Sequence, residues 1–171
     1  MDREQKFLLG IKYVLDQMYQ GWSDAAFDEL CNPSSDYVGL TFENRSNASL
    51  LAQKWQITVN VLYKLIEAGW LVFNKEPDEL VTLEDKQKYR KQYVIEKLAK
   101  NDPSKCEESS VSWFEYYDLT PVGEIFMKSC DDEDEEIADQ KFIRKFIEYF
   151  EIKDLKEWIE KPVVQVSKVC D

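Results

Sequence analysis

The sequence of 171 residues lacks histidine altogether, and its five glycines stand far apart. The absence of histidine excludes Ser-His-Asp and Cys-His catalysis in their usual forms, and also histidine-based metal sites. The scattered glycines form neither a GxGxxG motif nor a P-loop, so no phosphate-binding loop is expected. A carboxylate-only enzyme ranks last among the functional classes, because no spacing singles out a catalytic pair. We therefore expect a non-enzymatic protein with no catalytic residues, cofactor or metal.

Cysteine pairs and long apolar runs are also missing. The four cysteines lie far apart, and none belongs to a CxxC motif, so no disulfide framework is demanded. No apolar run approaches the ~20 residues that cross a bilayer. The N-terminal sequence MDREQ and the early Asp16 do not fit a signal peptide. These absences predict a cytoplasmic protein that does not interact with membranes.

Acidic side chains are abundant: the sequence has 34 Asp and Glu but only 22 Lys and Arg, which gives a net charge of −12. Only residues 44–100 are net basic, with 10 basic and 7 acidic side chains, whereas both flanks are acidic. An acidic surface repels phosphate backbones and attracts a basic protein surface. The alternative explanation of the charge is solubility alone.

The hydrophobic spacing predicts a mainly helical chain with short strands. Asn101–Ser110 is expected to be a polar loop, and Val163–Asp171 a tail or an edge strand. The other expected strands are Val38–Phe42, Trp70–Phe73 and Val111–Asp118. The expected helices are Gln5–Gln20, Asp24–Cys31, Leu50–Gln56, Val59–Ala68, Leu83–Lys100, one beginning at Thr120-Pro121, one containing Phe142–Phe150, and a short one around Leu155–Ile159.

Two segments resemble parts of a winged helix. Leu50–Gln56 and Val59–Ala68, separated by Ile57-Thr58, fit a helix-turn-helix in which Thr58 caps the second helix. The segment LYKLIEAGWLVF resembles the end of the second helix and the first wing strand of MarR- and PadR-like regulators. The segment DLTPVGEIFMK resembles the end of their second wing strand and the helix that follows. The resemblance covers residues 46–74 and 111–129. The alternative is a helical core with two accidental matches.

The resemblance implies a fold of the α+β class, mainly α. It would have a winged-helix-like core with a small β-hairpin or sheet and a C-terminal helical extension. Residues 1–130 would form the winged-helix-like domain, with a helical insertion over 83–100 between the wing strands. Residues 131–171 would form the acidic extension packed on it.

The winged-helix resemblance also implies a DNA-binding transcriptional regulator, which we keep as the alternative function. Candidate DNA contacts are Arg45, Lys54, Asn60 and Lys64. The outward face of the second helix is expected to show Val59, Asn60, Tyr63, Lys64 and Glu67. It carries no arginine, the commonest reader of guanine.

By composition the chain resembles acidic bacterial toxin-immunity proteins. That likeness implies an inhibitor that covers a basic surface of a protein partner such as a nuclease toxin. A homodimer through Phe142, Phe146 and Phe150 is a further expectation. The candidate partner contacts are Asn60, Tyr63, Glu67, Glu115, Tyr116, Tyr117, Asp131, Asp132 and Asp134.

Overall fold

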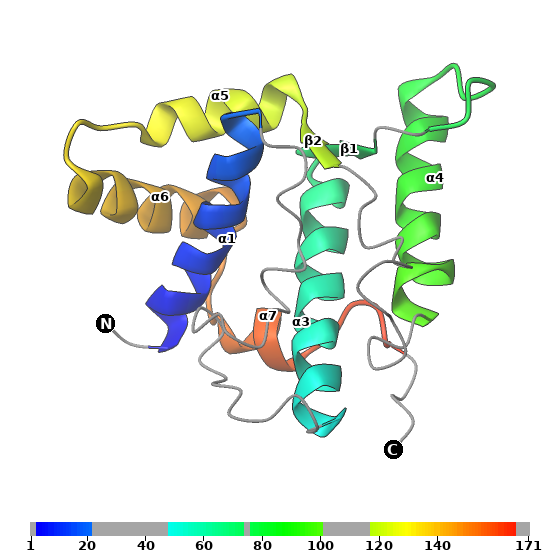
Figure 1. Ribbon diagram of the computed structural model, residues 1–171, viewed down its shortest axis with the longest axis horizontal. Helices are drawn as coiled ribbons and strands as arrows, with labels where there is room; N and C mark the ends of the chain where they lie inside the picture. Colours follow the sequence, from blue (N-terminus) through cyan, green and yellow to red (C-terminus); the bar gives the residue numbers. More distant parts are fainter. Residues whose placement is uncertain (1–2, 22–47, 74–75, 101–116, 167–171) are drawn as a thin grey trace.

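The computed structural model describes residues 3–21, 48–73, 76–100 and 117–166 (Figure 1). The expected helix over Asp24–Cys31 and the expected strand over Val38–Phe42 lie outside these residues. The elements, in chain order, are α1 (Arg3–Tyr19), α3 (Ala48–Glu67), β1 (Leu71–Phe73), α4 (Leu83–Glu96), the 3₁₀ helix η2 (Leu98–Lys100), β2 (Tyr117–Leu119), α5 (Pro121–Cys130), α6 (Glu135–Tyr149) and α7 (Lys156–Glu160).

The fold is mainly α with a two-stranded antiparallel sheet, which confirms the predicted class. Strands β1 and β2 pair Leu71 with Leu119 and Phe73 with Tyr117. Next to this ladder, the Thr120 amide donates a hydrogen bond of 2.8 Å to the Trp70 carbonyl. The sheet therefore joins the C-terminal end of α3 to the start of α5, as Figure 1 shows.

Helix α3 runs unbroken from Ala48 to Glu67, so the predicted turn at Ile57-Thr58 is wrong. No glycine or proline interrupts this stretch, and β-branched residues such as Thr58 are tolerated in a helix whose face is buried. The helix ends where expected: Gly69 has a φ of +74°, and the Trp70 amide donates to the Leu65 carbonyl. The helix-turn-helix that the winged-helix resemblance requires is thus not present within residues 48–67.

One hydrophobic cluster unites the described segments, including the C-terminal one. Helix α6 packs against α1 and α5, while α7 packs against α3 (Figure 1). Phe142 and Phe146 are fully buried, and Phe150 is half-buried against Trp70 and Trp158. The predicted dimer contact through these three rings is therefore wrong, because the rings form the core of a single chain.

Asn60 was expected on an outward face, and this expectation is also wrong. Its side chain is 1% exposed, because the end of α7 and the residues that follow it lie against α3. The Asn60 Nδ2 donates to the Trp158 carbonyl at 2.6 Å, and its Oδ1 accepts from the Val163 amide at 2.8 Å. Val59 is fully buried on the same helix.

The helix predicted between the two strands is present as α4, followed by η2. Thr82 caps α4 by accepting a hydrogen bond from the Asp85 amide at 3.1 Å. Further along, the nearly buried Arg90 forms a two-point ion pair with Glu76. Among the described residues, none of these helices is long and apolar enough to span a membrane.

Candidate protein-binding site

Among the described residues, a continuous run of exposed acids marks the joint between α5 and α6, which we call the acidic corner (residues 131–136). Its six consecutive side chains are all acidic and all exposed. Thr120 and Pro121 begin α5 as the sequence predicts, with the Thr120 hydroxyl accepting from the Gly123 amide. The corner follows the last residue of α5, Cys130, and leads directly into α6.

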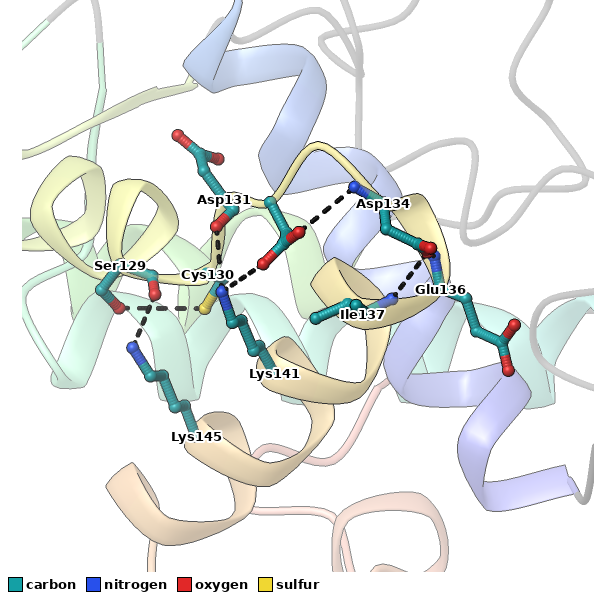
Figure 2. A network of polar contacts seen from close by, with 9 residues as sticks. Ser129, Cys130, Asp131, Asp134, Glu136, Ile137, Lys141 and Lys145 are labelled. Carbon is teal, nitrogen blue, oxygen red and sulfur yellow. Dashed lines mark hydrogen bonds and ion pairs between the residues drawn. The ribbon is translucent and has the colours of Figure 1, made fainter.

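Hydrogen bonds within the corner hold its backbone in place (Figure 2). The Asp134 Oδ1 caps α6 by accepting from the Glu136 amide at 2.9 Å and from the Ile137 amide at 3.3 Å. The Asp132 Oδ1 accepts from the Asp134 amide at 3.2 Å. These are the positions at which aspartate best satisfies the free amides of a helix start, so the acids make the turn rigid.

Two lysines of α6 reach back to the end of α5. The Lys141 ammonium lies 2.6 Å from Asp132 Oδ2 and donates to the Asp131 carbonyl, while Lys145 donates to the Ser129 carbonyl at 2.6 Å (Figure 2). The hydrogen bond from Lys141 lowers the pKa of Asp132, as does the bond from the Asp134 amide. Both lysines therefore stabilise the fold of the corner and neutralise only part of its charge.

The remaining acids of the corner keep an unbalanced negative charge. Within the described part of the chain, the carboxylates of Glu133, Glu135 and Glu136 take part in no ion pair. They stand beside Ile137, whose side chain is 46% exposed. Residues 131–145 hold seven acidic and three basic side chains, so the surroundings do not cancel the charge.

A half-buried cluster on α1 lies close to the corner. The Lys12 ammonium lies 2.7 Å from Asp16 and 3.3 Å from Asp139. Burial raises the pKa of Asp16 despite the Lys12 hydrogen bond, and the charges of Asp131 and Asp139 raise it further. Burial works to lower the pKa of Lys12, but its two carboxylate partners outweigh burial and raise it. The corner is thus electrostatically connected to α1.

Cys130 lies beneath the corner and is almost fully buried. Burial raises the pKa of its thiol, and the neighbouring Asp131 adds to this effect. A buried thiol with a raised pKa is a poor nucleophile, so Cys130 fits a packing role. In the described segments, no group of three or more histidine, cysteine, aspartate or glutamate side chains is placed to hold a metal ion.

The predicted contact residues on α3 do not form a second site. Glu67 is exposed, but it binds Lys91 at 3.3 Å, and Lys91 also lies over the half-buried ring of Tyr63. The ammonium of Lys64 lies 4.7 Å from the ring centre of Trp158. The candidate contacts on α3 are thus largely engaged with the chain itself.

The remaining predicted contacts divide between the core, the undescribed residues and the corner. Tyr117 is buried and packs edge-to-face on Phe73. Glu115, Tyr116, Arg45 and the side chain of Lys54 lie outside the described part of the structure. Of the candidate contacts that the structure describes, Asp131, Asp132 and Asp134 are the ones that come together on one exposed surface.

No protein-family model, curated protein or solved structure matches this chain.

Proposed function

We propose that this protein is a non-enzymatic binding module that covers a basic surface of a partner protein through its acidic corner. The observation that carries the proposal is a set of three exposed carboxylates on a rigid, capped turn, those of Glu133, Glu135 and Glu136, which take part in no ion pair within the described residues. Fixed charges of one sign steer a basic partner to the surface and exclude acidic ones. The rigid turn lowers the cost of ordering the contact, and Ile137 offers an apolar neighbour.

Inhibition is the activity that such binding best supports. A protein that covers a basic nucleic-acid-binding surface competes with the phosphates that the surface would otherwise bind. The corner supplies carboxylates in place of phosphates. A nuclease toxin is the partner class that combines a basic active site with a need for an inhibitor, in keeping with the compositional likeness to immunity proteins.

The DNA-binding alternative receives less support from the placement of its candidate residues. Asn60 is buried and hydrogen-bonded inside the chain, and Lys64 is stacked on Trp158. A duplex would also meet the acidic flanks of the molecule. If the purified protein retained DNA, this result would favour the DNA-binding alternative over the protein-binding proposal.

The test compares three forms of the immobilised protein in nuclease-treated extract of its native host. The corner variant is Glu133→Gln, Glu135→Gln, Glu136→Gln, which leaves Asp132 and Asp134 to hold the turn. The matched control is Glu96→Gln, Glu148→Gln, Glu151→Gln, which removes the same charge from other exposed positions. We expect a basic protein that is retained by the wild type and the control but not by the corner variant.

The retained protein is then purified and titrated directly. If it is a nuclease, its activity should fall in proportion to the added wild-type protein. Retention that all three forms share equally would contradict a role of the corner. Salt-dependent binding of a duplex by the wild type, without any retained protein, would favour the DNA-binding alternative.

A further inference from the structure

A second exposed surface lies at the other end of the molecule, and we call it the α4 tip (residues 76–85). Figure 1 places it beside α4 at one end of the long axis, with the α5–α6 joint at the opposite end. Two aliphatic side chains stand out on it: Val81 is 85% exposed and Leu83 is 72% exposed. These two side chains contribute little to the hydrophobic core, so folding alone does not explain them.

Hydrogen bonds and an ion pair hold the backbone of the α4 tip in a defined conformation. Glu76 at its base is tied to the buried Arg90, and the Leu80 amide donates to the Pro77 carbonyl at 3.1 Å. At its far end Thr82 and Asp85 form a mutual pair, in which the Thr82 hydroxyl donates to Asp85 Oδ2 at 2.6 Å. These hydrogen bonds hold the backbone on both sides of Val81 and Leu83.

Negative charge surrounds the two aliphatic side chains. Residues 76–85 read EPDELVTLED and hold five acids and no base. Glu76 binds Arg90 and Asp85 binds Thr82. Asp78, Glu79 and Glu84 are exposed, close in sequence to Val81 and Leu83. Exposed aliphatic side chains bordered by charged ones resemble the apolar centre and polar rim of a protein interface.

From this arrangement we infer that the α4 tip is a second protein-binding surface, distinct from the acidic corner. Val81 and Leu83 would enter an apolar pocket or groove on a partner protein, and Lys or Arg side chains around that pocket would meet Asp78, Glu79 and Glu84. The negative charge argues against a lipid surface, because anionic headgroups would repel the exposed carboxylates of Asp78, Glu79 and Glu84. The preformed tip favours binding because little conformational entropy is lost.

The probe for this inference is a helical peptide of leucine and lysine, in which one leucine face is bordered by lysines. Its control replaces every lysine with glutamate. The full-length protein is isotopically labelled, and its backbone amide shifts are followed during titration with each peptide. We expect shifts over residues 78–85 with the lysine peptide and none with the glutamate peptide.

Variants separate the tip from other apolar and acidic surfaces. Val81→Ser with Leu83→Ser should weaken the tip's affinity for the lysine peptide by about tenfold or more. Val122→Ser with Ile125→Ser removes two exposed aliphatic side chains of α5 and should change the affinity for the lysine peptide by less than about twofold. Circular dichroism verifies that both variants stay folded. The corner variant should leave the shifts at the tip unchanged.

Several results would overturn the inference. These are an absence of binding, shifts confined to residues 131–136, equal binding of the glutamate peptide, or an affinity that the tip variant retains. Binding to phosphatidylcholine vesicles that depends on Val81 and Leu83 would identify the tip as a lipid contact instead. Because the corner variant is tested separately, failure of the tip leaves the proposed function standing, and the reverse also holds.

Discussion

Asn60 in the middle of α3 holds the C-terminal segment of the chain through both ends of its amide. Its Nδ2 donates to the Trp158 carbonyl at 2.6 Å, and its Oδ1 accepts from the Val163 amide at 2.8 Å. Asn60 lies 98 positions before Trp158 and 103 before Val163 in the sequence, and its own side chain is buried. This contact makes the face of α3 that resembled a DNA-reading surface an internal interface.

Replacement of Asn60 by alanine should destabilise the protein by about 2–4 kcal/mol, because two backbone groups would lose their buried partner. Gln92→Ala on the exposed face of α4 is the control and should change stability by less than about 0.5 kcal/mol. Urea unfolding followed by tryptophan fluorescence measures both. A stable Asn60→Ala variant would mean that the C-terminal segment does not rest on α3.

Gly123 allows α5 to approach β1 closely. A Cβ atom at this position would lie 2.9 Å from the Trp70 carbonyl oxygen and 2.9 Å from a methyl group of Leu119. Gly123→Ala should therefore cost about 1–3 kcal/mol through overpacking, which exceeds the gain of up to ~1 kcal/mol in helix propensity. Thermal unfolding measures the loss, with Val122→Ala as the exposed neighbour for comparison. A net stabilisation would contradict the close packing.

The Arg90–Glu76 pair should behave as a coupled unit. Arg90→Met leaves the carboxylate of Glu76 largely buried without its partner, and should cost about 3 kcal/mol. The double replacement Arg90→Met, Glu76→Met should recover much of that loss, because neither charge remains to be desolvated. A double-mutant cycle of unfolding free energies measures the coupling. Additive effects of the two single changes would show that the ion pair does not form.

The sequence predicted several helix boundaries that are set by local chemistry. Gly69 ends α3, Thr82 begins α4, and Thr120 with Pro121 begins α5, because caps and proline act within one helical turn. Asp134 caps α6, and acidic side chains in this position are favourable at a helix N-terminus.

The sequence-based predictions for α3 were wrong where contacts with distant residues determine the structure. Thr58 was read as a helix cap, but the capping signal of a threonine is weak beside burial of the whole α3 face. Nothing near Asn60 in the sequence reveals that its side chain binds the backbone of Trp158 and Val163. The sequence also could not predict that Val81 and Leu83 are exposed. Their exposure depends on which distant segments of the chain do not pack against the α4 tip.

Asp16 should give stability a specific dependence on pH. Burial raises its pKa in the folded protein above the ordinary value of 3.8, so the folded state binds the proton more tightly than the unfolded state. The contribution of Asp16 to stability should therefore rise as pH falls through its folded pKa towards the ordinary value. It should be smallest near neutrality, where the half-buried carboxylate is charged beside Asp131 and Asp139.

The measurement is the unfolding free energy of the wild type and of Asp16→Asn between about pH 7 and about pH 4. The wild type should gain stability relative to the variant on acidification, since the variant has no proton to bind. The other carboxylates titrate in both proteins and cancel in the comparison. A relative loss of stability on acidification would mean that Lys12 lowers the pKa of Asp16 below its ordinary value.

The central claim is that the carboxylates of the acidic corner make the contact with a basic partner. The most direct test is the Kd of the purified partner at about 0.15 M salt for the wild type, the corner variant and the matched control. We predict a partner affinity at least about tenfold weaker for Glu133→Gln, Glu135→Gln, Glu136→Gln, and a change below about twofold for the control. Equal affinities for the corner variant and the control would contradict it.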